Sequence, residues 1–191
     1  MNRYELMEIL VPALKDSLVI CNIGIPSQEL FAISDRENHF YMLGSMGLCS
    51  SIGLGLALTT DKSVVALEGD GAVLMNLGTF ATIGNRAPDN LILLVVDNGS
   101  YGSTGDQATF TSERTSLAEV ARGAGCQTVV ECSVEDTTEV LIDALGSKRQ
   151  SVIISKVAPG NRPVPVVPLH PIVLRERFKK TIRTGFDLSV Q

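Results

Sequence analysis

Two short motifs place oxygen-bearing side chains directly after apolar runs. The first is Gly-Asp-Gly at residues 69–71, and the second is Asp-Asn-Gly at residues 97–99. The carboxylate of Asp70 and the amide carbonyl of Asn98 are hard oxygen ligands, which suit Mg²⁺ or Ca²⁺ better than softer metals. The glycines let backbone N–H groups approach an anion, and a helix starting near residue 72 would add the positive end of its dipole. This combination is typical of a metal–diphosphate site.

Each motif taken alone also has a purely structural interpretation, because Asp-Gly and Asn-Gly pairs form turns after strands. The functional interpretation depends on the two motifs together, since Asp70 and Asn98 lie 28 residues apart at successive strand ends. In open α/β sheets, ligands bind at the carboxyl ends of the strands. If the two strands are neighbours in the sheet, we expect Asp70 and Asn98 to converge on one point.

Apolar runs alternate with amphipathic segments along the chain. Near-continuous Val, Ile and Leu runs are typical of strands buried on both faces, as in a parallel sheet. Strands are predicted at residues 18–22, 63–68, 91–97, 127–130 and 151–157. Helices are predicted at residues 4–15, 27–33, 47–58, 72–84, 116–124 and 134–145. The alternation predicts an α/β fold, a single three-layer domain with a mostly parallel sheet.

The C-terminal part has a different composition. Five prolines lie between residues 159 and 171, which excludes a regular helix or an inner strand there. Residues 172–182 then interleave basic with apolar side chains, which is typical of a helix with a solvated face or one that docks on an acidic partner. We therefore expect an α/β domain over residues 1–158. An arm and a C-terminal helix over residues 159–191 would pack on that domain or on a partner.

Composition argues against several classes of protein. The 191 residues are 45% hydrophobic and 19% charged, as in a folded globular chain. The net charge of -5 argues against a nucleic-acid partner. No apolar run approaches the ~18–20 residues of a membrane helix, and the first ten residues do not resemble a signal peptide. With four scattered cysteines expected to be free thiols, these features predict a cytoplasmic protein.

Several other catalytic motifs are missing from the sequence. A dinucleotide-binding glycine pattern that began at Gly69 would need a glycine where Leu74 stands. There is no Gly-x-x-x-x-Gly-Lys phosphate loop and no Gly-x-Ser-x-Gly elbow, and neither histidine is placed as a base for a nucleophile. The cysteines do not cluster as ligands of zinc or an iron–sulfur centre.

The segment from Gly69 to Asn98 resembles the cofactor motif of thiamine-diphosphate enzymes, in which Gly-Asp-Gly is followed by an Asn, often as Asn-Asn. Asp97 stands at the first position of that pair, which leaves Asn98 in place. The resemblance implies that Asp70 and Asn98 bind Mg²⁺ through their side chains and that Ser100 binds it through its backbone carbonyl. Diphosphate oxygens and water would complete the octahedron.

The Gly-Ser-Met-Gly segment at residues 44–47 resembles the part of this family that holds the aminopyrimidine of thiamine diphosphate. The resemblance implies that the Gly44 carbonyl accepts from the 4′-amino group and that Met46 supports the bent, reactive shape of the cofactor. A flexible thioether among glycines would also suit a crowded core. Gly44 and Met46 are thus the expected catalytic residues. The full set of cofactor-binding residues implied is Gly44, Ser45, Met46, Gly69, Asp70, Gly71, Ala72, Asn98, Ser100, Tyr101 and Gly102.

One subgroup of these enzymes, the decarboxylases of sulfopyruvate and phosphonopyruvate, is similar in further segments, at residues 22–27, 40–48, 51–58, 76–78 and 101–105. The similarity extends over roughly residues 18–178. It implies a carboxy-lyase acting on a small 2-oxo acid. The reaction would convert 3-sulfopyruvate to sulfoacetaldehyde and CO₂, as in coenzyme M biosynthesis, or phosphonopyruvate to phosphonoacetaldehyde. The sequence leaves the choice between sulfonate and phosphonate open.

Enzymes of this family use a second domain that supplies a glutamate to the pyrimidine ring. No glutamate in this chain lies in a similar context, and Glu68 belongs to the strand before the diphosphate motif. A separate α subunit would then carry the pyrimidine-binding domain and its activating Glu, and an apolar patch would face it. Two alternatives are a β subunit of a 2-oxoacid:ferredoxin oxidoreductase, which the scattered cysteines disfavour, and a non-catalytic binding module.

Overall fold

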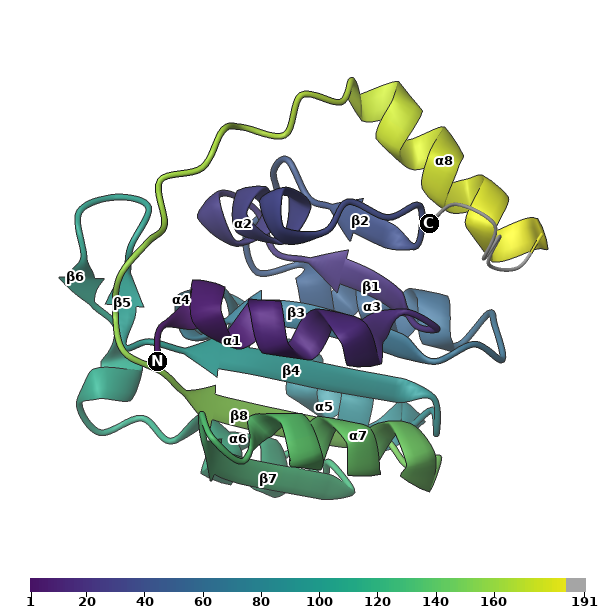
Figure 1. The fold of residues 1–191 in the computed structure, drawn as a ribbon. Helices are drawn as coiled ribbons and strands as arrows, with labels where there is room; N and C mark the ends of the chain where they lie inside the picture. The colour runs from purple at the N-terminus through teal and green to yellow at the C-terminus, as the bar shows by residue number, and fades with distance from the viewer. Residues whose placement is uncertain (185–191) are drawn as a thin grey trace.

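The computed structural model describes residues 1–184, which form three layers around a six-stranded sheet (Figure 1). All strand pairings in this sheet are parallel, and the strand order is β2-β1-β3-β4-β8-β7. The predicted parallel α/β fold is therefore confirmed. The strands are β1 (Leu18–Cys21), β2 (His39–Tyr41), β3 (Val64–Gly69), β4 (Leu91–Asp97), β7 (Thr128–Ser133) and β8 (Ser151–Lys156).

The central strands are apolar on both faces because helices cover both faces. In β4, Leu93 and Val95 belong to one hydrophobic core, whereas Leu94 and Val96 belong to the other. Every residue of this strand is buried. The near-continuous apolar runs in the sequence thus serve two cores, one on each side of the sheet.

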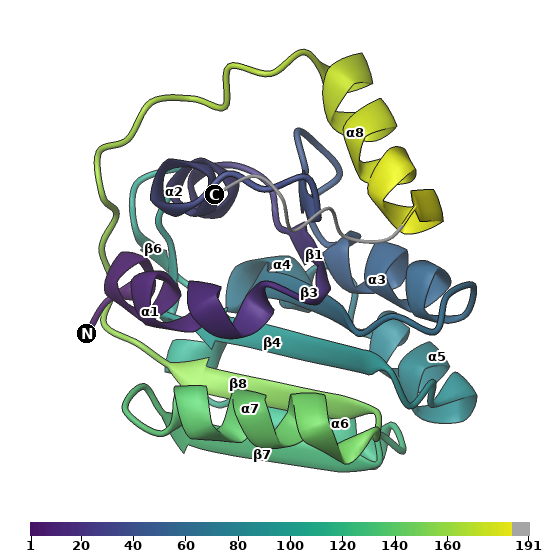
Figure 2. The same cartoon turned by 45° about the vertical axis from the view of Figure 1, so that its right-hand side comes forward.

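The helices form the two outer layers (Figures 1 and 2). One layer holds α1 (Arg3–Leu10), the 3-10 helix η1 (Val11–Leu14), α2 (Ile25–Ile33) and α7 (Thr137–Ser147). The other holds α3 (Cys49–Ala57), α4 (Asp70–Leu74), α5 (Gly78–Arg86) and α6 (Leu117–Gly123). Within residues 1–184, none of the helices combines the length and the apolar character needed to cross a membrane.

The single helix predicted over residues 72–84 is wrong, because the chain forms two helices there. α4 ends at Leu74, and α5 begins at Gly78. Asn76 lies in the break, and its Nδ2 donates to the carbonyl of Gly47 at 3.1 Å and to Ser51 Oγ at 3.3 Å. An Asn whose side chain bonds elsewhere favours a turn over a helix interior, and Gly78, two residues later, lowers the helix propensity further.

Short elements were not predicted. They are the edge strand β2, the two-residue strands β5 (Ser100–Tyr101) and β6 (Gln107–Ala108), and the 3-10 helix η2 (Phe110–Ser112). β5 and β6 pair antiparallel and form a hairpin over residues 100–108. Segments of two or three residues are too short to show a period of side-chain polarity, so the sequence contains no signal for them.

An arm without regular structure leads from β8 across the molecule to α8 (Pro171–Thr184), which lies beside the edge strand β2 (Figure 1). The rings of Phe178 and Phe40 pack with centroids 5.4 Å apart, and both guanidinium Nη atoms of Arg177 donate to Asp35 at 2.7 Å. The helix expected over residues 172–182 is present and packs on the domain. The division at residue 158 stays a prediction, and residues 185–191 of the expected arm lie outside the described residues.

Candidate functional site

β3 and β4 are neighbours in the sheet, which is the arrangement required for Asp70 and Asn98 to lie close together. They pair in parallel, with Gly69 opposite Val96. Asp70 begins α4 immediately after β3, and Asn98 follows β4. Both motifs therefore lie at the same edge of the sheet, where the parallel strands present their carboxyl ends.

Asp70 is buried, and hydroxyl groups hold its carboxylate. Its Oδ2 accepts from Thr109 Oγ1 at 2.5 Å and from Thr111 Oγ1 at 2.9 Å. Burial raises the pKa of Asp70, and the nearby Asp97 adds to this rise, whereas the two threonine hydroxyls lower it. Oδ1 receives no hydrogen bond from another side chain within residues 1–184. The two threonine hydroxyls thus fix the carboxylate through one of its oxygens.

Asp97, which departs from the family pattern, has structural partners of its own. Its Oδ2 pairs with Lys156 Nζ at 2.6 Å, and its Oδ1 accepts from the backbone N–H of Gly99 at 3.0 Å. The Thr111 hydroxyl also lies 2.8 Å from Oδ1. The side chain therefore fixes the turn after β4, and a lysine on the adjacent strand balances its charge.

Two asparagine side chains at this edge contain buried polar atoms without a partner among the described residues. Asn98 Oδ1 accepts from the backbone N–H of Ser100 at 3.1 Å, but its Nδ2 is unpartnered. Asn22 follows β1, the neighbour of β3, and its Oδ1 is also unpartnered. Buried polar groups are normally hydrogen-bonded, so these orphaned atoms indicate that the edge is built to receive polar groups from a ligand.

The donor atoms at this edge fit a hard cation. The carboxylate of Asp70, the amide of Asn98 and the backbone carbonyl of Ser100 are all oxygen ligands of the kind that Mg²⁺ takes. Within residues 1–184 there is no group of three or more His, Cys, Asp or Glu side chains that could hold a metal ion. A hard-cation site made of one carboxylate, an amide and a carbonyl stays a prediction from the sequence.

Tyr101 lies against the Gly-Asp-Gly motif. A Cβ added at Gly71 would overlap the Tyr101 ring, so only glycine fits there. An open cavity of about 550 Å³ lies beside the same hairpin. It is lined by Asn98, Gly99, Ser100, Asp106, Ala108, Ser112, Pro159 and Gly160.

The loop at residues 44–47 is brought against the start of α4. A Cβ at Gly47 would lie 3.1 Å from the carbonyl oxygen of Ala72, and Gly47 has a φ of 87°. Gly44 and Ser45 are exposed, and Met46 is half-buried. The structure thus places the loop expected to hold an aminopyrimidine next to the motif expected to hold a diphosphate.

Glu68 has a structural partner, as expected from its place in the strand. Its Oε2 accepts from the backbone N–H of Ser50 at 3.0 Å, in the first turn of α3. Burial raises the pKa of this carboxyl group. Glu68 therefore positions the start of the helix that follows the 44–47 loop.

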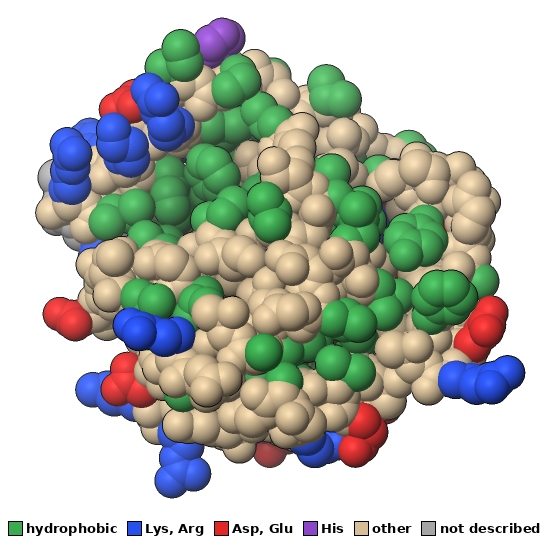
Figure 3. Space-filling view, turned by 180° about the vertical axis from the view of Figure 1, so that it is seen from behind, with side chains coloured by type: hydrophobic (Ala, Val, Ile, Leu, Met, Phe, Trp, Pro, Cys, Tyr) green, Lys and Arg blue, Asp and Glu red, His purple; other side chains and the backbone are tan. Residues whose placement is uncertain are grey.

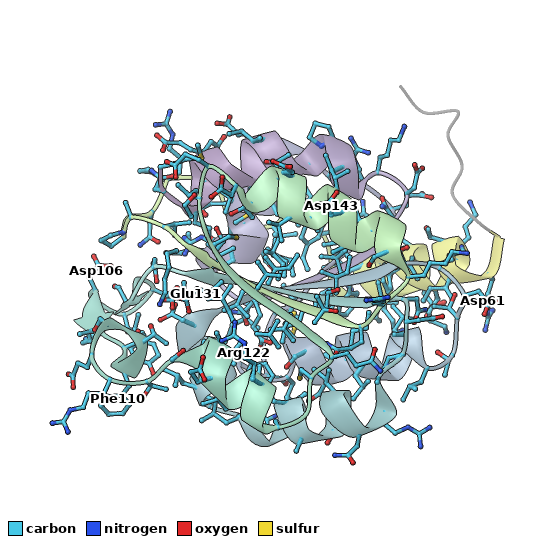
Figure 4. The ribbon with its side chains drawn as sticks, turned by 90° about the horizontal axis from the view of Figure 1, so that it is seen from below. Asp61, Asp106, Phe110, Arg122, Glu131 and Asp143 are labelled. Carbon is cyan, nitrogen blue, oxygen red and sulfur yellow. The ribbon has the colours of Figure 1, made fainter. Side chains whose placement is uncertain are left out.

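A second, larger cavity lies elsewhere, at the opposite edge of the sheet. It has a volume of about 640 Å³, and its lining includes Asp61, Ser63, Asn90 and Lys148, near the amino ends of the strands. Figure 4 shows Asp61 at one end of the molecule and Asp106 and Phe110 at the other. We place the site at the end with Asp106, because the buried carboxylates of Asp70 and Asp97 lie there beside the incompletely paired amides of Asn22 and Asn98.

Similarity to known proteins covers most of this domain. The model of the C-terminal TPP-binding domain of thiamine pyrophosphate enzymes matches residues 25–155. The sulfopyruvate decarboxylase subunit beta of Methanococcus maripaludis is 46% identical over 183 residues, which cover 96% of this chain and 98% of that one. The chain belongs to the sulfopyruvate decarboxylase β-subunit family. Its domain is therefore the thiamine-diphosphate-binding domain of a decarboxylase.

Longer relatives contain this domain as one part. The sulfopyruvate decarboxylase of Methanosarcina acetivorans is 40% identical over 95% of this chain, which corresponds to 47% of that protein. The phosphonopyruvate decarboxylase of Streptomyces viridochromogenes is 42% identical over 77% of this chain and 37% of its own length. A solved thiamin diphosphate-dependent enzyme from Mycobacterium smegmatis has a TM-score of 0.66 at 21% identity, and this chain spans 32% of it. The last comparison supports the fold alone.

Sequence reasoning missed the residues that hold the motifs in place. Thr109 and Thr111 contact Asp70 across 39 and 41 residues of sequence, and Lys156 contacts Asp97 across 59. Side-chain partners so far apart leave no local pattern. Only the predicted adjacency of two strand ends could have suggested that Lys156, at the end of β8, lies near Asp97.

Proposed function

We propose that this chain is the β subunit of a heteromeric decarboxylase that converts 3-sulfopyruvate to sulfoacetaldehyde and CO₂. The convergence of Asp70 and Asn98 at neighbouring strand ends, next to the 44–47 loop, carries this proposal. It supplies hard oxygen donors and glycine-lined backbone in one place. The near full-length similarity to a β subunit of this activity supports the choice of substrate.

Asp70, Asn98 and the Ser100 carbonyl would hold Mg²⁺. Backbone groups of Gly69, Gly71, Ala72, Tyr101 and Gly102 would surround the diphosphate. Gly44, Ser45 and Met46 would contact the aminopyrimidine. Thiamine diphosphate, when bound, supplies the electron sink for loss of CO₂ from a 2-oxo acid. The chain's own residues would orient the cofactor and exclude water from it.

A separate α subunit would complete the site. The single-chain relative from Methanosarcina acetivorans is about twice as long as the part that matches this chain. Large apolar side chains are exposed near the site, at Leu43, Leu48, Ile52, Met75 and Phe110. Figure 3 shows hydrophobic side chains gathered on the face opposite to the view of Figure 1. A patch of this kind supports a partner surface that would bring the activating glutamate.

The test is turnover by the chain co-purified with its α subunit, from the cytoplasm of a host that expresses both. We expect CO₂ release from sulfopyruvate that needs thiamine diphosphate, Mg²⁺ and both subunits. A complex that binds the cofactor but converts phosphonopyruvate with the higher kcat/KM would assign the alternative substrate, that of the phosphonopyruvate decarboxylase to which this chain is also similar. A complex that binds no cofactor would contradict the proposal and favour a non-catalytic binding module.

A further inference from the structure

Four segments far apart in the sequence meet in a polar cluster beside the β5–β6 hairpin. Arg3 of α1 donates from Nε to Glu29 Oε2 at 2.7 Å and from Nη2 to Asn161 Oδ1 at 2.8 Å. Glu29, in α2, is fully buried, and its other oxygen accepts from the backbone N–H of Arg162 at 2.8 Å. Asn161 Nδ2 in turn donates to the carbonyl of Gly102 at 2.8 Å. The helices α1 and α2 thus fix the first residues of the arm, and the arm fixes the hairpin.

This cluster is complete, because none of the buried side-chain atoms of Arg3, Glu29 or Asn161 lacks a partner. A buried polar network in which every member is paired is rigid and specifies one arrangement. Breaking one of its contacts should therefore change the position of the arm and of the β5–β6 hairpin.

The hairpin end of the cluster is tightly packed. A Cβ at Gly102 would lie 2.9 Å from Asn161 Oδ1 and 3.1 Å from Nδ2, so the Asn161 side chain sits directly on the Gly102 backbone. The preceding residue, Tyr101, is the one whose ring covers Gly71 of the Gly-Asp-Gly motif. Its carbonyl accepts from the backbone N–H groups of Thr104 at 3.1 Å and Asp106 at 3.2 Å, which ties the turn together. The contact at Gly102 is thus one residue from the ring that closes over the diphosphate motif.

We propose that Asn161 is a positioning residue for the cofactor, which acts by holding Gly102, and with it Tyr101 and the Ser100 carbonyl, in the geometry that binds diphosphate and metal. Arg3 and Glu29 hold Asn161 in turn. This inference rests on the proposed function, because it takes the hairpin as part of the cofactor site. The proposal assigns to the arm and to α1 a role in the site that the motifs at residues 69–71 and 97–99 do not indicate.

The substitution Asn161→Asp separates this role from folding. The aspartate keeps an oxygen for Arg3, whereas its second oxygen replaces the Nδ2 donor and faces the Gly102 carbonyl, which repels it. The matched control is Asn85→Asp, because exposed Asn85 also donates its amide to a backbone carbonyl, that of Ala81 at 2.7 Å in α5. The readouts on the α–β complex are the affinity for thiamine diphosphate with Mg²⁺, by calorimetry, and hydrogen exchange of the hairpin amides without cofactor.

We expect Asn161→Asp to speed exchange at residues 100–106 and to weaken cofactor affinity about tenfold, as is usual when a residue that supports metal ligands is removed. Asn85→Asp should change neither readout. Unchanged affinity in Asn161→Asp, with or without faster exchange, would overturn the positioning role while leaving the proposed function intact. A wild-type complex that binds no cofactor would instead overturn the proposed function, and the inference with it.

Discussion

The two edges of the sheet differ in a way that shows what makes a site. The carboxyl edge has the smaller cavity, but it holds the buried Asp70 and Asp97 carboxylates and the orphaned amide atom of Asn98. The amino edge has the larger cavity, yet the amide of Asn90, which lines that cavity, is fully engaged. There Asn90 donates to the carbonyls of Ala57 at 3.2 Å, Thr60 at 2.7 Å and Lys62 at 2.9 Å.

Cavity volume alone is therefore a poor guide, and we place the site where two buried carboxylates lie beside incompletely paired amides. A buried donor or acceptor without a partner costs free energy, so two such atoms beside buried carboxylates are a candidate ligand-binding feature. The amino edge uses Asn90 to join loops, whereas the carboxyl edge leaves Asn98 and Asn22 incomplete. This difference predicts that substitutions at the carboxyl edge will alter function and that substitutions at the amino edge will alter stability.

The largest effect is expected from Asp70→Ala at the carboxyl edge. Loss of an expected ligand to the cation should abolish Mg²⁺-dependent cofactor binding and reduce kcat/KM by about 10²–10³-fold or more, since electrostatic groups at a reacting centre are worth about 10²–10³ each. The measurement is turnover by the α–β complex, with circular dichroism to confirm folding.

The control for Asp70→Ala is Asp61→Ala, which removes an exposed carboxylate at the amino edge. It should retain wild-type turnover. Full activity in Asp70→Ala would show that the site has been placed at the wrong carboxylate.

Gly71→Ala should have the next largest effect. The added Cβ would overlap the Tyr101 ring, so the hairpin has to shift and cofactor affinity should fall by about tenfold or more. Gly55→Ala is the matched control, because a Cβ there meets no atom within 4 Å in the interior of α3. It should leave affinity unchanged and stabilise the fold by about 0.4–1 kcal/mol. Equal affinities for the two variants would contradict the packing of Tyr101 on the motif.

Asn90→Ala tests the amino edge. Its amide hydrogen bonds to three loop carbonyls are lost, and we expect the free energy of unfolding to fall by about 1–3 kcal/mol. Urea unfolding measures this change. Cofactor affinity of the folded variant should match that of the wild type. A loss of affinity without a loss of stability would contradict the assignment of function to the carboxyl edge and stability to the amino edge.

The smallest effect at neutral pH concerns His39, in the edge strand β2. Burial lowers its pKa to about 3, with Arg36 adding to the shift and Asp35 opposing it. Between that value and the unfolded pKa of about 6.5, the unfolded chain binds the extra proton. The stability that neutral His39 contributes is thus full above pH 6.5 and is lost as the pH falls, by up to about 1.4 kcal/mol per pH unit. We would measure the free energy of unfolding in urea at several pH values from 7 to 5. Plotted against pH, it should fall less steeply for His39→Gln than for the wild type.

Much of the fold could be predicted because its signals are local. The apolar runs of β3 and β4 indicated strands buried on both faces, and the motifs after them indicated the carboxyl edge. The break between α4 and α5 was missed because it depends on Asn76 reaching Gly47, a contact across 29 residues. The polar cluster of Arg3, Glu29 and Asn161 was missed for the same reason, since its members lie up to 158 residues apart.

The most direct test of the account is the location of the cation. A crystal of the α–β complex with thiamine diphosphate and Mn²⁺ in place of Mg²⁺ would reveal the metal by its anomalous scattering. We predict a single peak at the carboxyl edge, within about 2.0–2.3 Å of an Asp70 carboxylate oxygen, the Asn98 amide oxygen and the Ser100 carbonyl. A peak at another position, or cofactor bound with Asn98 turned away from the metal, would contradict the convergence of the two motifs on one site.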